Sequence, residues 1–195
     1  SLERKVPAAA SASQIQHVDA VFLSHEHGDH RDPAALEQIV SRSMCQLIGP
    51  AEALQGVDVP ERLKMAVSEG ERFSIGGIDV QITPAKHPQS VHPVGFAVSS
   101  GGQSVYHAGD TYDFHGLSGI TADVGLLPIG GTFTMDVLGA ITALKRMRLK
   151  KAVPMHYNTF DQIRADPRDF EQRARQTKTA VSVMAPGDCI ELQYG

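Results

Sequence analysis

The sequence predicts an α+β fold in which helices cover mixed β-sheets. Apolar segments of strand length outnumber helical patterns along the chain, and the helices fall between groups of strands. Turn residues, including several Gly-Gly pairs, separate these segments. The chain has 195 residues, of which 42% are hydrophobic, which suits one domain with a substantial core. We therefore expect a single domain over residues 1–195, with residues 1–16 forming a tail or loop.

The first part of the chain predicts two strands and two helices. Residues 19–24 and 45–48 are short apolar runs, which indicate buried strands. Between them, Asp32 followed by Pro33 is typical of an N-cap and a first helical position, so a helix should run to about Ser41. A short helix is expected over residues 50–54.

The rest of the chain predicts two hairpins followed by alternating strands and helices. Gly76-Gly77 and Gly101-Gly102 each separate two short apolar runs, which is a hairpin signal. The expected elements are strands 72–75, 78–83, 94–99, 104–107, 124–129 and 152–155, helices 136–148 and 166–177, and a terminal strand pair, 181–184 and 189–192.

The composition argues against several classes of function. The net charge of −4 gives no overall reason to bind nucleic acid or an anionic membrane, and the basic run 145–151 is interpreted as a helix end favoured by the helix dipole. No apolar run approaches the roughly 18 residues of a membrane span, and no signal peptide is recognisable. Cys45 and Cys189 are interpreted as core residues in a reducing compartment. We expect a cytoplasmic protein that binds a small molecule; a homo-oligomer is left open.

The segment after the first strand reads H-x-H-x-D-H and contains four metal-ligand residues, His25, His27, Asp29 and His30. In an extended backbone, the side chains of two residues that are two positions apart point to the same face, so His25 and His27 should do so. Gly28 permits a sharp turn that directs Asp29 and His30 elsewhere. Imidazole and carboxylate suit zinc, iron or manganese, so the motif predicts two adjacent metal sites.

Three further ligand-type residues follow other strands: His87, Asp110 and His156. Rigid strand ends that meet at one rim are how α/β scaffolds build sites, so these side chains are expected to join the first motif. His92 is a competitor for His87, because it lies only five residues further along.

Several segments extend the pattern: VYHAGDT at 105–111, LPIG at 127–130, TFTM at 132–135 and PMHYNTF at 154–160. Together with the motif at 25–30 they resemble the metallo-β-lactamase superfamily, and more closely its branch of metal-dependent hydrolases related to ascorbate-phosphate lactonases. The resemblance extends from about Val18 to the C-terminus.

This resemblance implies an αβ/βα sandwich with a two-metal site between the sheets. It assigns one metal to His25, His27 and His87 and the other to Asp29, His30 and His156, with Asp110 as the bridge. It also implies a hairpin ahead of the first motif. Only 24 residues precede His25, and those ahead of the strand at 19–24 have no strand pattern, so we expect the first sheet to lack its N-terminal hairpin.

The predicted function is hydrolysis of an ester, lactone or phosphoester of a small molecule by a hydroxide that bridges two divalent ions. Such ions lower the pKa of water toward ~7 and polarise the substrate. The chain contains neither G-x-S-x-G nor S-x-x-K, in line with a mechanism without a protein nucleophile. Asp29 is the predicted catalytic residue, because its carboxylate can also accept a hydrogen bond from the nucleophile.

Zinc is the expected metal, with manganese or iron as alternatives, since His and carboxylate ligands accept all three. An iron-dependent redox enzyme and a metal-stabilised binding module are the alternative functions, and a nuclease is less favoured. The roles of four residues are left open between the site and ordinary packing or loop structure: His107, His115, Asn158 and Thr159. His17 is expected to be exposed.

Overall fold

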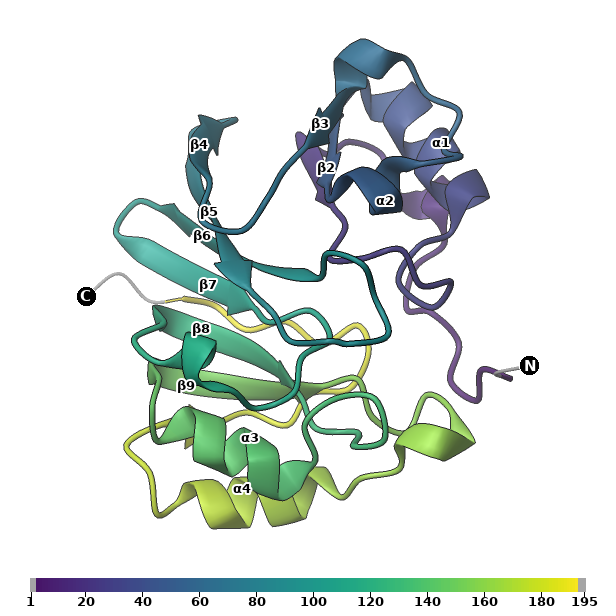
Figure 1. The fold of residues 1–195 in the computed structure, drawn as a ribbon. Helices are drawn as coiled ribbons and strands as arrows, with labels where there is room; N and C mark the ends of the chain where they lie inside the picture. The colour runs from purple at the N-terminus through teal and green to yellow at the C-terminus, as the bar shows by residue number, and fades with distance from the viewer. Residues whose placement is uncertain (1–2, 193–195) are drawn as a thin grey trace.

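A computed structural model describes residues 3–192, which form two β-sheets with helices on their outer sides (Figure 1). The smaller sheet is parallel and has the order β1-β2-β3. Its strands are β1 (Ala20–Phe22), β2 (Gln46–Gly49) and β3 (Lys64–Ala66). The sequence predicted β1 and β2 but not β3, whose three residues carry no periodic signal.

The larger sheet has seven strands in the order β10-β9-β8-β7-β6-β5-β4. Its strands β4 to β7 are antiparallel, and β7 to β10 are parallel. Both predicted hairpins form, with Gly76 and Gly101 at positive φ in the two turns. The strands are β4 (Arg72–Ile75), β5 (Ile78–Pro84), β6 (Val94–Ser100), β7 (Gln103–His107), β8 (Thr121–Pro128), β9 (Arg148–Met155) and β10 (Ala180–Val181).

The helices begin where the sequence predicts. The Asp32 carboxylate accepts the Ala35 N–H at 3.2 Å, and Pro33 takes the first position of α1. The helices are α1 (Pro33–Ser43), α2 (Ala51–Leu54), α3 (Val137–Leu144) and α4 (Pro167–Ala174). Single 3-10 turns are η1 (Ala12–Gln14), η2 (Glu61–Leu63), η3 (His115–Leu117) and η4 (Asp161–Ile163). None of the helices in residues 3–192 has the length and apolarity needed to cross a bilayer.

Three apolar clusters divide the molecule into αβ/βα layers (Figure 1). One lies between α1 and the small sheet and includes Val40 and Leu47. A second lies between the two sheets around Ile48 and Ile82, and a third packs α3 and α4 on the large sheet. The expected sandwich of mixed sheets and covering helices is therefore observed.

Several predicted elements differ in extent from those observed. The helix predicted over 166–177 ends at Ala174, and the strands predicted over 124–129 and 152–155 begin at Thr121 and Arg148. The helix predicted over 136–148 ends at Leu144, because Arg148 already pairs with Thr121 in the large sheet. Four residues of the basic run 145–151 therefore lie on strand β9 rather than at a helix end.

The predicted terminal strand pair is also wrong. Only Ala180 and Val181 form a strand, which adds to β9 in parallel, and residues 189–192 are not in a sheet. The chain turns at residues 185–188, where the Asp188 side chain accepts the Ala185 N–H at 2.8 Å. Cys189 is consequently exposed, whereas Cys45 is buried as expected.

Candidate metal centre

The segment after β1 carries the first four candidate ligands and is fixed to both sheets. The Leu23 N–H donates to the Ile48 carbonyl on β2 at 2.8 Å, and the Val94 N–H donates to the Ser24 carbonyl at 3.0 Å. His25 follows directly and is fully buried between the layers. The expected turn forms at residues 28–30, and Gly28 adopts it without a positive φ.

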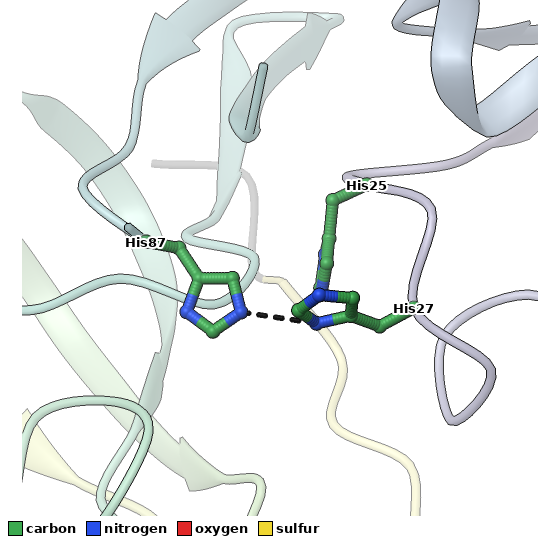
Figure 2. Close-up of side chains that lie close together, drawn as sticks. All are labelled: His25, His27 and His87. Carbon is green, nitrogen blue, oxygen red and sulfur yellow. Dashed lines mark hydrogen bonds between the residues drawn. The ribbon is translucent and has the colours of Figure 1, made fainter. Parts of the chain in front are cut away.

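His25, His27 and His87 form the first group of converging side chains (Figure 2). Figure 2 shows His25 and His27 entering from one chain segment and His87 from the segment after β5, with the three rings directed at one another. The His27 Nδ1 and His87 Nε2 atoms are 3.1 Å apart.

Backbone carbonyls determine which ring nitrogens of this group carry protons. The His27 Nε2–H donates to the Gln89 carbonyl at 3.0 Å, and the His87 Nδ1–H donates to the Phe133 carbonyl at 3.1 Å. In the neutral rings the two facing nitrogens are then both lone pairs. Two ligands on a tetrahedral zinc at 2.0–2.1 Å lie about 3.3 Å apart, so a cation would fit between them.

The second group contains Asp29, His30, His156 and one oxygen of Asp110. The Nε2 atoms of His30 and His156 are 3.1 Å apart. Each lies 3.5 Å from Asp29 Oδ2, and they lie 3.3 and 3.4 Å from Asp110 Oδ1. These five separations are close to the roughly 3.3 Å edge of a tetrahedral zinc site.

Asp110 lies between the two groups. While its Oδ1 atom faces His30 and His156, its Oδ2 atom is 4.0 Å from His25 Nε2. Gly109 permits this placement: it has φ +60°, and a Cβ there would lie 2.7 Å from the Val94 carbonyl oxygen and 2.9 Å from Ser24 Cβ. A single carboxylate can therefore offer one oxygen to each group.

A buried polar atom without a partner supports the presence of a ligand here. Within residues 3–192, His25 Nε2 is buried and makes no hydrogen bond. Leaving such an atom unpaired costs about 1–3 kcal/mol, and a metal ion would satisfy it. The donor set, imidazole nitrogens and carboxylate oxygens, matches divalent first-row metals.

Electrostatics keeps these groups in states that bind metals. Burial, assisted by the nearby His30, lowers the pKa of His25 to about 3, and burial also lowers the pKa of His87. The hydrogen bond from His156 holds the pKa of Asp29 far below its usual range. Burial opposes ionisation of Asp110, yet the hydrogen bond and charge of His30 lower its pKa overall. These shifts favour neutral imidazoles at His25 and His87 and ionised carboxylates at Asp29 and Asp110.

His156 behaves differently from the other histidines. Burial disfavours its charged form, but the hydrogen bond to Asp29 and the charge of Asp110 outweigh burial and raise its pKa. Its backbone is in the left-handed region at φ 54°, which is uncommon for a residue with a side chain. The fold thus holds this imidazole against the two carboxylates.

The candidate ligands open into a cavity of about 870 Å³. Six of the seven candidate ligands line it, all except the fully buried His25, together with Arg4, Arg31, Gln89, Phe133, Thr159 and Phe160. Of these additional residues, the sequence singled out only Thr159. Arg31 directly follows the H-x-H-x-D-H motif, and that adjacency could have indicated it. Nothing in the sequence signals Arg4.

All seven predicted ligands meet at this site, and the other histidines lie outside it. His92 is exposed and bonds Glu52 at 3.0 Å, and His17 and His115 are also exposed. His107 Nδ1 accepts the Gly109 N–H at 3.1 Å, and the ring borders a separate cavity of about 320 Å³ between the sheets. Asn158 braces its own loop through two hydrogen bonds with the backbone of Ala165.

Comparison with known proteins relates this site to a family. Residues 1–157 match the family model of the Beta-lactamase superfamily domain. A UPF0173 metal-dependent hydrolase from Carboxydothermus hydrogenoformans is 38% identical over 188 residues, covering 89% of this chain and 82% of that protein.

Solved structures share the fold. Igni18, a metallo hydrolase from the archaeon Ignicoccus hospitalis, superposes with a TM-score of 0.78 at 33% identity, covering 91% of this chain and 81% of that one. The metallo-beta-lactamase fold protein YhfI from Bacillus subtilis gives a TM-score of 0.71 at 18% identity, covering 91% and 78%. The chain described here therefore belongs to the metallo-β-lactamase superfamily and is one of its metal-dependent hydrolases.

Proposed function

We propose that this hydrolase uses two divalent metal ions to cleave an ester, lactone or phosphoester of a small molecule. His25, His27 and His87 would hold one ion, and Asp29, His30 and His156 the other, with Asp110 shared between them. Zinc is the proposed metal, and manganese and iron are the alternatives that the same ligands accept.

The spacing of the second group carries the proposal. Four ligand atoms from Asp29, His30, Asp110 and His156, on three separate segments of the chain, lie 3.1–3.5 Å apart in the five pairs measured. Ordinary packing has no reason to gather two imidazoles and two carboxylates at that spacing, whereas a tetrahedral metal does.

The metal ions, when bound, would lower the pKa of a shared water toward ~7 and polarise the substrate oxygen that develops charge. The residues of this chain supply the rest. Asp29 lines the cavity and is ionised, so its carboxylate can accept a hydrogen bond from the attacking water and keep its lone pair directed at the substrate. The carbonyls of Gln89 and Phe133 hold the rings of His27 and His87 in the metal-binding orientation.

Metal analysis combined with an activity panel tests the proposal. Elemental analysis of the purified protein should find one or two first-row divalent ions per chain. The protein loaded in turn with zinc, manganese and iron should hydrolyse at least one of a set of esters, lactones and phosphodiesters. No metal uptake on reconstitution would overturn the metal site.

Two other results would overturn the hydrolytic assignment while preserving the metal site. Oxygen consumption by the iron-loaded protein without hydrolysis would indicate a redox enzyme. Full metal occupancy without turnover of any compound in the panel would favour a metal-stabilised binding module.

A further inference from the structure

We propose that the cavity takes a substrate with an anionic group, a carboxylate or a phosphate monoester, that Arg31 and Arg4 bind beside the bond to be hydrolysed. The inference rests on the proposed function and adds the class of substrate. Both arginines line the cavity that contains the candidate metal ligands. In the described part of the chain, each guanidinium bonds only a backbone carbonyl, and neither has a carboxylate within 4.0 Å.

Arg31 is positioned by the residues around it. It directly follows His30, and its Nη2 donates to the Gln55 carbonyl. Its Nε atom is buried and makes no hydrogen bond to residues 3–192. A guanidinium has five N–H donors, and a buried donor without an acceptor is costly. An anion in the cavity would provide acceptors and neutralise a charge that the protein leaves uncompensated.

Arg4 is brought to the cavity by its neighbour Lys5. The Lys5 N–H donates to the Thr159 carbonyl at 2.8 Å, and Lys5 Nζ lies 3.5 Å from an oxygen of Asp161. These contacts fix the N-terminal segment to the loop that follows His156. Arg4 Nε donates to the Val6 carbonyl at 2.6 Å, so its two terminal nitrogens remain available to a ligand.

With the two proposed metal ions bound, the net charge of the cavity would favour an anion. Its carboxylates are Asp29, Asp32 and Asp110, and Asp32 is engaged as the N-cap of α1. Two divalent ions would more than neutralise Asp29 and Asp110, and the two arginines then add further positive charge. The planar guanidinium also matches carboxylate and phosphate oxygens in a bidentate fashion.

Two chromogenic esters test the proposal in the zinc-loaded protein. Mono(4-nitrophenyl) succinate carries a free carboxylate, and 4-nitrophenyl butyrate is a neutral ester with the same leaving group. The preference for the anionic ester, as a ratio of kcat/KM values, should fall about tenfold in Arg31→Gln and in Arg4→Gln. Arg175→Gln changes an exposed arginine at the C-terminal end of α4 that does not line the cavity, and it should leave the ratio unchanged.

Failure to hydrolyse either ester would count against the proposed hydrolytic function but would not test anion binding. A direct binding measurement tests anion binding in that case. Monomethyl succinate and methyl phosphate are titrated into zinc-loaded wild type, Arg31→Gln and Arg4→Gln by calorimetry, after zinc content is matched. At least one of the two anions should bind about tenfold more weakly to both variants, and that anion identifies the group recognised. Equal affinities of wild type and variants for both anions would overturn the proposal.

Discussion

Gly130 lies against the backbone of a proposed metal ligand, so its substitution should affect the two proposed metal sites unequally. A Cβ at position 130 would lie 2.3 Å from the His156 carbonyl oxygen and 2.8 Å from Ile163 Cβ. Because carbon–oxygen contacts below 3.0 Å essentially do not occur, the His156 backbone would have to move by about 0.7 Å.

That displacement is large compared with the few tenths of an ångström by which metal–ligand distances in a protein site vary. His156 Nε2 lies 3.1–3.5 Å from three other ligand atoms, and its backbone is already in the left-handed region. We expect Gly130→Ala to weaken the metal bound by Asp29, His30 and His156 about 10- to 100-fold. Overpacking of this kind costs about 1–3 kcal/mol, which lowers the melting temperature by roughly 3–10 °C for a chain of this length.

The assay is zinc stoichiometry after gel filtration, with thermal unfolding measured in parallel. Gly130→Ala should retain about one tightly bound zinc, at the group of His25, His27 and His87. Gly28→Ala is the matched control beside the site, since a Cβ there has no neighbour within 4 Å and its φ is ordinary. Two tightly bound zinc ions and a wild-type melting temperature in Gly130→Ala would refute the reasoning.

Three other changes give sharp expectations. Asp110→Ala should reduce metal content and hydrolysis together, and retention of both ions would show that the bridge lies elsewhere. Glu26→Gln should weaken metal binding several-fold, measured by competition with a chelator. Glu26 accepts hydrogen bonds from the Ser90 hydroxyl and the Val91 N–H, and these hold the loop whose Gln89 carbonyl orients the His27 ring. In metal-free protein the pKa of His25 is depressed to about 3 from 6.5, so the unfolded chain binds more protons between these values. Its free energy of unfolding should therefore fall as the pH is lowered from 6.5 toward 3, and urea titrations at pH 7.5 and 5 that show the reverse trend would contradict this assignment.

The elements that the sequence predicted well are those specified by local chemistry. Asp32-Pro33 and Asp166-Pro167 fix helix starts through the capping side chain and the proline φ, and these interactions need no tertiary context. The Gly-Gly hairpins are equally local. The end of α3 and the pairing of Val181 with β9 depend instead on which strand competes for the backbone, and no short window of sequence contains that information.

The candidate site divides in the same way. The ligand residue types and their positions after strands predicted the convergence of seven side chains. Four of them follow β1 of the small sheet and three follow strands of the large sheet, so the ends of strands from both sheets meet at one rim. The cavity wall was not predictable from pattern. Arg4 reaches it only because the Lys5 backbone docks on Thr159, more than 150 residues away in the chain. Such contacts follow from the folded surface rather than from any motif.

The site also couples metal binding to the stability of the fold. In the neutral tautomers favoured by the Gln89 and Phe133 carbonyls, nitrogen lone pairs of His27 and His87 face each other 3.1 Å apart, and a buried nitrogen of His25 has no hydrogen-bond partner within residues 3–192. The two carbonyls hold these ring orientations and so pre-organise the ligands. A metal ion bound at the proposed site would remove this repulsion, and the unfolded chain has no preformed site for it. Free zinc at 100 times its dissociation constant would thus add about 2.7 kcal/mol to the free energy of unfolding per site. The hydrogen bonds from His27 and His87 to the two carbonyls therefore have two effects: they bring the lone pairs together in the metal-free protein, and they orient the same nitrogens for a metal ion.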